Sequence, residues 1–396
     1  MEEKIVFVSP CRSAIGKVDG ALSSLSSVDL CVKAINSVID RSGLKKNDIN
    51  HVVIGSALQA GCGQNIARQA IIKAELPHKT VGQTINMVCG SGLQAVNTAV
   101  MLIKTNQAEV VIAGGVESMS NAPHILQNVN KMKQLSTGAV LSSIITDGLW
   151  ENNGNYHMGI TAENLAEKYL ISREEQDKFA LESQEKYRHA LENERFKDEI
   201  FPMVIETKGE KLVFDRDEHP RNVTIESLSR LNPVFKQNGT VTVGNSSGVN
   251  DGVAMVLVMS EKKAKELGVT PIAVWKDTSC IGVDPKYMGI GPALATEELL
   301  NKNEIGVNDL DLIESNEAFA AQSLAVEKYL NWDRRKVNVN GGAISLGHPL
   351  GASGCRILVT LLHELNREKY KLGLATLCIG GGMGIAMLVE RYNDEK

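Results

Sequence analysis

Residues 85–100 read INMVCGSGLQAVNTAV: a short apolar run ends in Cys89 and passes through Gly-Ser-Gly into a longer periodic segment. After Cys89, apolar residues recur at positions 93, 96, 100 and 103, which is the period of a helix with one buried face. The stretch therefore predicts a strand, a glycine turn and a helix, with a cysteine at the helix N-terminus.

The same order of elements recurs along the chain. Short β-branched runs such as KIVFV, HVVIG and EVVIAGG alternate with longer periodic segments, as is typical of an α/β protein. In the second half, LDLIESNEAF predicts a strand and GASGCRILVTLLHEL a helix after a glycine turn. DI at residues 48–49 matches DL at 309–310, and SG at 91–92 matches SG at 353–354, at offsets of 261 and 262 residues. These nearly equal offsets predict a duplicated α/β unit.

The middle of the chain differs in composition, with charged helices and polar loops. There Ser172 and Glu175 form a capping box that predicts a surface helix. The apolar pattern resumes at GVNDGVAMVLVMS. We therefore expect an N-terminal half made of residues 1–120 plus 246–270, an inserted loop domain over residues 121–245, and a C-terminal half over residues 271–396.

The composition excludes several classes of protein. The 396 residues are 22% charged, with a formal net charge of -5 and both signs well mixed, so there is no electrostatic basis for binding nucleic acid. No apolar run approaches the roughly 20 residues of a membrane span, and MEEKIVFVSP does not resemble a signal peptide. Seven scattered cysteines without a C-x-x-C pair argue against a disulfide framework and against a structural zinc site. We expect a cytoplasmic protein that binds no membrane, nucleic acid or metal.

Cys89 is the first candidate for chemistry. A helix N-terminus lowers the pKa of a thiol that faces it, and the small residues after Cys89 leave room for a substrate and for backbone N–H groups that face an oxyanion. The alternative is a buried cysteine that serves as a small apolar residue. This stretch by itself leaves both readings open.

His348 lies between glycine turns in GGAISLGHPLGASG, where an imidazole can act as a base near pH 7. The alternative is a histidine hydrogen-bonded to a loop carbonyl. His348 occupies the duplicated counterpart of the Cys89 turn. Two equivalent turns that meet around a pseudo-twofold axis would bring the thiol and the imidazole together.

Two further stretches end strands with polar or flexible residues. LCIGGGMG places Cys378 before three glycines, and the N–H of Gly380 can face a developing oxyanion. SNEAFAAQS places Asn316 where an apolar strand ends, the side on which α/β proteins carry sites. The alternatives are a buried cysteine before a bend and a helix-capping asparagine.

Together, NMVCGSG, NEAFAA, GGAISLGHPLGASG and CIGGGMG, in this order and spacing, closely resemble the thiolase family and specifically its short-chain acetyl-CoA acetyltransferases. The resemblance extends over essentially the whole chain. It implies two halves of one duplicated fold in five layers, α-β-α-β-α, with the insertion as a loop domain that covers coenzyme A. It also implies an acyltransferase that condenses two acetyl-CoA to acetoacetyl-CoA and coenzyme A, with these thioesters as substrates and no other cofactor.

The resemblance implies a role for each candidate residue. Cys89 would be the nucleophile that carries the acetyl group, His348 its base, and Cys378 the acid/base toward the second acetyl group. Asn316 would hold a water that, with His348, stabilises the enolate oxygen. The N–H groups of Cys89 and Gly380 would form the other oxyanion hole.

The family pattern also implies contacts to coenzyme A and the acyl group. Met288 would restrict the acyl pocket to short chains, and residues 122–140 stand in the place of the family's tetramerisation loop, which implies a homotetramer, a dimer of dimers. Ser246, Val249 and Ser345 depart from the usual family residues. The rivals are a degradative thiolase acting on longer 3-ketoacyl-CoA and a non-catalytic acyl-CoA binding member of the fold. The remaining implied contacts are Ser247, Gly248, His157, Leu149, Arg221, Phe235, Ala318 and Phe319.

Overall fold

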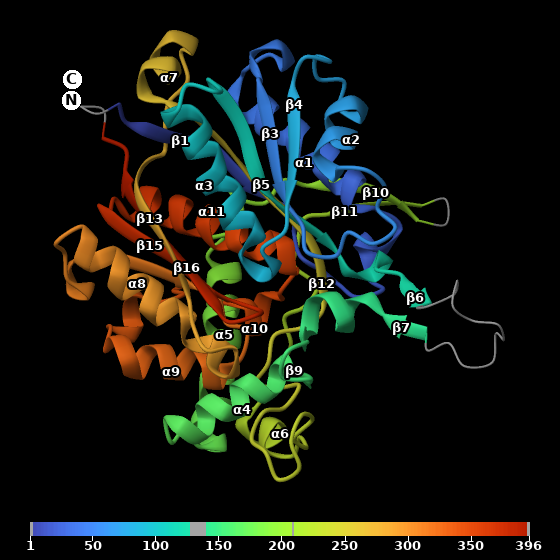
Figure 1. Ribbon diagram of the computed structural model, residues 1–396, viewed down its shortest axis with the longest axis vertical. Helices are drawn as coiled ribbons and strands as arrows, with labels where there is room; N and C mark the ends of the chain where they lie inside the picture. Colours follow the sequence, from blue (N-terminus) through green and yellow to red (C-terminus); the bar gives the residue numbers. More distant parts are fainter. Residues whose placement is uncertain (1–2, 127–139, 208–209, 394–396) are drawn as a thin grey trace.

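The computed structural model describes residues 3–126, 140–207 and 210–393, and it has the alternating α/β order that the sequence predicts (Figure 1). The elements of the N-terminal half are β1 (Ile5–Arg12), β2 (Gly16–Lys17), α1 (Ser27–Ser42), β3 (His51–Gly55), α2 (Ile66–Lys73), β4 (Val81–Ile85), α3 (Ser91–Lys104), β5 (Val110–Ser118), β12 (Asn250–Ser260) and α7 (Glu261–Leu267). Those between residues 121 and 245, the segment called the insertion below, are β6 (His124–Leu126), β7 (Val140–Ser142), β8 (Trp150–Glu151), β9 (Tyr156–His157), α4 (Met158–Lys168), α5 (Arg173–Glu192), β10 (Met203–Thr207), β11 (Glu210–Phe214) and α6 (Ile225–Ser229). Those of the C-terminal half are β13 (Ala273–Gly282), α8 (Gly291–Lys302), β14 (Leu312–Ser315), α9 (Ala320–Leu330), α10 (Ala343–Leu346), α11 (Leu350–Glu368), β15 (Leu372–Ile379) and β16 (Met383–Arg391).

The predicted duplication is confirmed in the sheet. β5 runs antiparallel to β12, and β15 runs antiparallel to β16 in the same relative place. The 3-10 turns Lys46–Asp48 and Val307–Asp309 precede β3 and β14, which are the positions of the matching DI and DL pairs. The strand order β4-β3-β5-β12-β1 continues as β13-β16-β15-β14. The two halves form one sheet because β1 and β13, the first strands of each half, pair over a short stretch.

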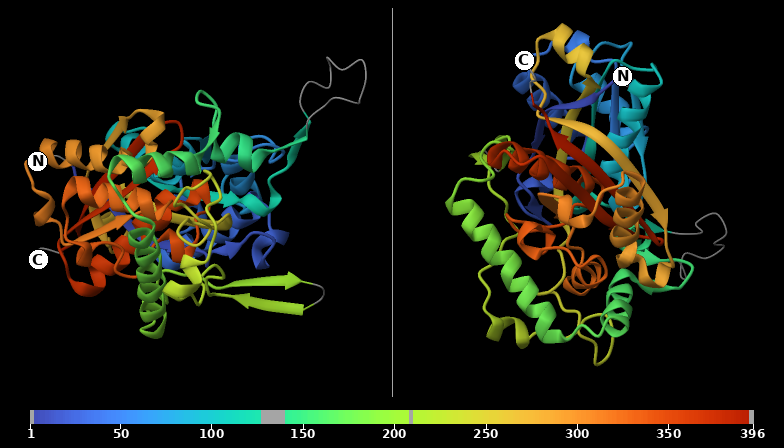
Figure 2. Two further views of the ribbon diagram at one scale, coloured as in Figure 1. Left: turned by 90° about the horizontal axis from the view of Figure 1, so that it is seen from below. Right: turned by 90° about the vertical axis from the view of Figure 1, so that its left-hand side faces the viewer.

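The predicted five layers are also confirmed. α1 and α2 cover the outer face of the first half, α8 covers the outer face of the second, and α3 and α11 lie between the two parts of the sheet (Figures 1 and 2). The predicted apolar face of α3 is buried in one cluster with α11 and the strands of both halves. Each fully buried aliphatic side chain of this kind stabilises the fold by about 1.5–3 kcal/mol.

The two central helices cross at the glycines of the matching SG pairs. A Cβ on Gly92 of α3 would lie 2.7 Å from the carbonyl oxygen of Gly351 in α11, and a Cβ on Gly354 would lie 2.6 Å from the backbone nitrogen of Leu93. Only glycine allows backbones to approach this closely. The crossing brings the N-terminal ends of α3 and α11, and the turns before them, next to each other.

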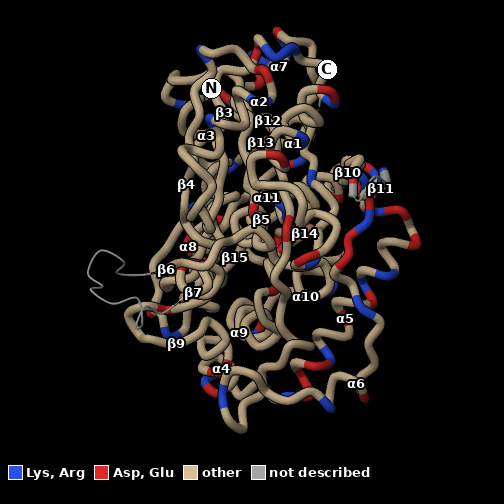
Figure 3. Tube along the Cα trace, turned by 90° about the vertical axis from the view of Figure 1, so that its right-hand side faces the viewer, with Lys and Arg blue, Asp and Glu red and all other residues tan. Residues whose placement is uncertain are grey.

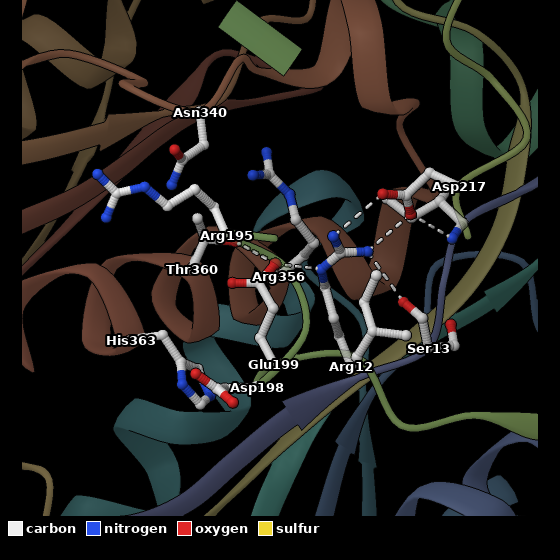
Figure 4. A network of polar contacts seen from close by, with 12 residues as sticks. Arg12, Ser13, Arg195, Asp198, Glu199, Asp217, Asn340, Arg356, Thr360 and His363 are labelled. Atoms are coloured by element: carbon white, nitrogen blue, oxygen red, sulfur yellow. Dashed lines mark hydrogen bonds and ion pairs between the residues drawn. The ribbon is translucent and has the colours of Figure 1, made fainter. Parts of the chain in front are cut away.

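A buried ion network joins the insertion to both halves (Figure 4). The guanidinium of Arg12 on β1 donates from Nε to Glu199 Oε1 at 2.6 Å and from Nη1 to Asp217 Oδ1 at 2.7 Å. Thr360 on α11 donates to Glu199 Oε1 at 3.2 Å. Both ion pairs are almost fully removed from water. Removal of one partner would leave a buried charge without its counter-charge and would strongly destabilise the fold.

The predicted capping box of α5 is confirmed, because Ser172 and Glu175 satisfy each other's backbone N–H groups. The prediction of a surface helix is only partly right. Ser183 on α5 is buried and its hydroxyl donates to Glu317 Oε2 at 2.7 Å, so α5 packs on the C-terminal half with a polar contact. Amphipathic spacing did not reveal this face because it contains serine and glutamine as well as apolar residues.

In the view of Figure 3, positions of Lys and Arg are interspersed with positions of Asp and Glu along the chain. Of the helices the structure describes, none combines the length and the apolar character that crossing a membrane requires.

Candidate active site

A cavity of about 270 Å³ lies where three turns meet. Its lining includes Cys89 from the turn before α3, His348 from the turn before α11, and Cys378 and Gly380 from the end of β15. The structure thus brings the two duplicated turns to one cavity, as the pseudo-twofold argument expects. The third turn is held against the first, because a Cβ on Gly90 would lie only 2.5 Å from Ile379 Cδ1.

The turn that carries Cys89 is strained. Val88 has a φ of 47°, a left-handed conformation that is rare for a β-branched residue and costs about 1–3 kcal/mol. Ser91 closes the turn, since its hydroxyl accepts from Met87 N at 2.8 Å and donates to Val88 O at 2.7 Å. The N-cap residue of α3 is Gly90, which has no side chain to cap the helix, and the N–H of Ser91 donates to Val88 O within the preceding turn.

The resting state of Cys89 differs from the sequence expectation. Burial raises the pKa of its thiol to about 11, although hydrogen bonds from the N–H of Gly380 and from its own N–H favour the thiolate. The prediction of a lowered pKa is therefore wrong for this structure, because desolvation by the second half of the fold outweighs the helix terminus. Cys89 is a neutral thiol that needs a base before it can attack.

His348 lines the same cavity as Cys89. Its ring Nδ1 lies 2.5 Å from Ser353 Oγ, and the single hydroxyl proton of Ser353 is donated to Pro349 O at 2.9 Å. With the hydroxyl proton of Ser353 donated to Pro349 O, Nδ1 carries the ring proton and Nε2 keeps its lone pair. Burial and then the charge of Arg356 lower the pKa of His348 to about 3, so the ring is neutral at rest.

The backbone around His348 is equally fixed. Its N–H donates to Asn250 Oδ1 at 2.9 Å. Gly347 has a φ of 105°, and a Cβ there would lie 2.5 Å from Asn250 Cγ. The strand β12, which begins at Asn250, thus sets the position of the imidazole.

Cys378 is 1% exposed, and burial followed by the proximity of Cys89 raises the pKa of its thiol. It is therefore protonated at rest. Gly381 and Gly382, both with a φ of 86°, turn the chain directly from β15 into β16. This tight turn leaves the N–H of Gly380 beside the sulfur of Cys89.

Asn316 directly follows β14 and is fully buried, but it is not among the described residues that line the cavity. Neither its Oδ1 nor its Nδ2 has a hydrogen-bond partner within the described part of the chain. An unpaired buried amide costs about 1–3 kcal/mol, so the position fits one that holds a water.

The walls of the cavity form a mostly apolar slot. The rings of His157 and Phe235 stack at 4.7 Å, and Phe235 meets Phe319 edge-on at 6.0 Å. Gly159 gives the ring of Phe235 its room, since a Cβ there would lie 2.2 Å from Phe235 Cγ. Eight residues expected to contact substrate line the cavity: Leu149, His157, Phe235, Ser247, Gly248, Met288, Ala318 and Phe319.

The structure does not bring Arg221 to this wall. Its Nη1 donates to Val243 O at 3.2 Å and its backbone N–H donates to Gln184 Oε1 at 2.9 Å. The guanidinium is held by the insertion, while the neighbouring His219 packs against Gly248 of the wall.

Several lining residues were not predicted as contacts, and Ser353 was missed as the partner of His348. The signal for Ser353 lay in the duplication, because Ser91 and Ser353 are the matching serines and each donates to a carbonyl of its own turn. The residues missed in the wall are Met119, Ile145, Gly148, Met158, Ser246, Val249 and Leu350.

Comparisons with known proteins agree over the whole chain. The family models described as "Thiolase, N-terminal domain" and "Thiolase, C-terminal domain" match residues 5–262 and 269–391. An acetyl-CoA acetyltransferase of Thiocystis violacea is 51% identical over 99% of this chain and 100% of its own length. One of Cupriavidus necator is 51% identical over 98% of this chain and 99% of its own.

Solved structures are similar to the same extent. The crystal structure of the Bacillus anthracis acetyl-CoA acetyltransferase has a TM-score of 0.96 at 44% identity and covers 99% of both chains. That of human mitochondrial 3-ketoacyl-CoA thiolase in complex with CoA has a TM-score of 0.95 at 39% identity, with 99% of this chain and 98% of that chain covered.

Proposed function

Because this chain belongs to the thiolase family, we propose that it is an acetyl-CoA C-acetyltransferase that catalyses the reversible condensation of two acetyl-CoA to acetoacetyl-CoA and coenzyme A. Relatives of that name are about half identical to it over their full lengths. The observation that carries the proposal is one cavity lined by two thiols, an imidazole and a backbone N–H at the end of an apolar slot.

In the first step, His348 Nε2 takes the proton of the Cys89 thiol as the sulfur attacks the carbonyl of acetyl-CoA. The N–H groups of Cys89 and Gly380, which both face the sulfur at rest, donate hydrogen bonds to the oxyanion. When the tetrahedral intermediate collapses, His348 returns the proton to the departing thiolate of coenzyme A. The product is an acetyl thioester on Cys89.

The second step makes or breaks the carbon–carbon bond. In the cleavage direction, Cys89 attacks the 3-keto carbonyl of acetoacetyl-CoA, the bond between the second and third carbons breaks, and the enolate of acetyl-CoA departs. Cys378, which is protonated at rest, gives its proton to that enolate carbon. Condensation is the reverse: Cys378 first passes its proton to His348, its thiolate then takes a proton from the methyl carbon of the second acetyl-CoA, and His348 returns its proton to the departing sulfur of Cys89.

Asn316 is proposed to act through a water. Its two unpaired side-chain atoms support this role, because a water bound there would satisfy a buried amide and still donate toward the cavity. With His348, such a water would stabilise the enolate oxygen.

Substrate preference is proposed to be short-chain. Met288 is 3% exposed and lines the cavity, and Met119 and Met158 line it as well, so little room remains beside the reacting carbons. The similarity to a 3-ketoacyl-CoA thiolase means that the fold does not decide chain length.

The test is coenzyme A-dependent cleavage of acetoacetyl-CoA beside a series of longer 3-ketoacyl-CoA thioesters. We expect cleavage confined to the four-carbon substrate, abolished in Cys89→Ser and extended to longer chains in Met288→Ala. Activity that rises with chain length in the unmodified protein would contradict the substrate assignment. Absence of cleavage with every thioester would contradict the function.

We further propose the chain boundaries 1–120 plus 246–270, 121–245 and 271–396, a homotetramer and a cytoplasmic location. Of the stretch 122–140 on which the tetramer prediction rests, residues 127–139 lie outside the described residues. Exposed apolar side chains at Leu126 and Val140, on the paired strands β6 and β7, support an interface there.

Seven free cysteines support a reducing compartment. Coenzyme A thioesters are proposed as substrates, with no additional cofactor.

A further inference from the structure

Glu117, near the end of β5, is a fully buried carboxylate without an ion-pair partner in the described part of the chain. Four donors surround it instead. Its Oε2 accepts from Gly351 N at 2.8 Å and from Ala57 N at 2.9 Å. Its Oε1 accepts from Leu58 N at 3.1 Å and from the hydroxyl of Ser56 at 3.2 Å. Three of these groups can only donate, so the arrangement fits the ionised carboxylate even though burial raises the pKa of Glu117.

Hydrogen bonds connect Glu117 to the turn that carries Cys89. Ala57, whose N–H binds Glu117, accepts with its carbonyl from Asn86 Nδ2 at 3.1 Å. The Oδ1 of Asn86 accepts from Val88 N at 2.9 Å, directly before Cys89. The segment after β3 thus supports the strained turn of the thiol.

Glu117 also contacts the start of α11, the helix that follows His348. Gly351 is the second residue of α11, and no side chain of its N-cap residue, Pro349, satisfies the N-terminus of that helix. Instead, Glu117 on β5 accepts the hydrogen bond from Gly351 at this end of the helix. The helix dipole favours a negative charge there. Gly115 allows β5 and the start of α11 to pack this closely, since a Cβ there would lie 1.9 Å from Gly351 O.

We propose that Glu117 is a positioning residue of the thiolase reaction, whose carboxylate clamps the His348-bearing end of α11 to the segment that supports the Cys89 turn. The clamp spans the two duplicated halves, because its donors come from residues after β3 and from the start of α11. It does not touch the reacting atoms. The inference rests on the proposed function for its kinetic consequence.

The charge of Glu117 has a second consequence. Among the groups that act on Cys89, burial comes first, but the Glu117 carboxylate also disfavours the thiolate and raises the pKa of Cys89. The other titratable groups near this pair are Cys31 on α1 and Cys62 before α2, which lie near Glu117, and Cys378 and His348, which share the cavity with Cys89. Burial thus keeps the resting thiol protonated, and the Glu117 carboxylate acts in the same direction.

Two conservative variants separate the clamp from the charge. Glu117→Asp keeps the charge but withdraws the carboxylate from its donors, while Glu117→Gln keeps the side-chain length, removes the charge and breaks the contacts of one oxygen, because an amide NH2 cannot accept from backbone N–H groups. Glu199→Gln, a buried carboxylate of the Arg12 network, is the matched control. The measurements are the rate constant for alkylation of Cys89 by iodoacetamide between about pH 7 and pH 9, followed by peptide mass spectrometry, and kcat and KM for acetoacetyl-CoA cleavage.

We expect Glu117→Gln to be alkylated faster than the unmodified protein at each pH, because loss of the carboxylate removes one of the influences that disfavour the thiolate of Cys89. Glu117→Asp should match the unmodified protein within about twofold in alkylation. Both variants should lose about tenfold or more in kcat with a smaller change in KM, as expected for a misplaced base. Glu199→Gln should lose thermal stability and leave both rates unchanged.

Unchanged kcat in both variants would overturn the clamp. Equal acceleration of alkylation in both variants would mean loosened packing and would overturn the charge effect. If Glu117→Gln fails to fold, Glu117→Asp alone still decides the clamp. If the unmodified protein cleaves no thioester, the proposed function fails, whereas the alkylation rates still report on the charge of Glu117.

Discussion

The crossing of α3 and α11 at glycine predicts a specific defect in Gly92→Ala. The new Cβ would start 2.7 Å from Gly351 O and 2.9 Å from Cys355 N, where ordinary contact begins at 3.4 Å. The helices would have to separate by about 0.7 Å at this point, since both neighbours are backbone atoms. Overpacking of this kind costs about 1–3 kcal/mol, against about 0.5–1 kcal/mol gained from the less flexible unfolded chain. We expect a net loss of about 1–2 kcal/mol.

Activity should fall by more than stability. Cys89 and His348 precede the two helices that separate, so their distance grows with the crossing, and a misplacement of about 1 Å can cost a hundredfold in rate. Urea denaturation and kcat for acetoacetyl-CoA cleavage measure the two effects. Gly282→Ala is the control, because no atom of the described residues lies within 4 Å of its Cβ position. If Gly92→Ala has the unfolding free energy and kcat of the unmodified protein, the close helix crossing does not position the Cys89 and His348 turns.

Three further predictions follow from single contacts. Ser353→Ala removes the acceptor of His348 Nδ1–H and should lower kcat about ten- to a hundredfold with little change in KM; a kcat within twofold would show that the tautomer is set elsewhere. Arg12→Met leaves two buried carboxylates unpaired and should lower the unfolding free energy in denaturant titration by about 3–5 kcal/mol; a loss under about 1 kcal/mol would contradict the network. Burial and then Arg221 lower the pKa of His219 to about 4, below the ordinary 6.5, so the unfolded chain binds a proton that the folded chain excludes. Stability should therefore fall as pH drops from about 6.5 to 4, by at most about 3 kcal/mol, and His219→Gln should flatten this dependence; an unchanged slope would contradict it.

Much of the fold was predictable because its signals are local or repeated. The spacing after Cys89 fixes a helix with one apolar face, and Gly268 ends α7 in a left-handed conformation after the last periodic residue. The meeting of the Cys89 and His348 turns followed from the duplication, because equivalent turns of two similar halves face one axis.

Features that depend on the other half of the fold were not predictable. The pKa of Cys89 rises because strands and helices distant in sequence bury it, which no local pattern reports. Glu117 looked like an ordinary strand residue, since its donors lie about 60 and 234 positions away. The direction of the Arg221 side chain, which turns to Val243, could not be predicted either, because a motif gives the residue and not the course of a long side chain.

The central claim is that Cys89 carries the acetyl group. The direct measurement is peptide mass spectrometry of the protein quenched in acid after brief mixing with acetyl-CoA. The account predicts an added acetyl group on the peptide that contains Cys89, lost on addition of coenzyme A and much reduced in His348→Asn. Acetylation of Cys378 instead, or turnover of acetoacetyl-CoA with no acetyl group on either cysteine, would contradict it.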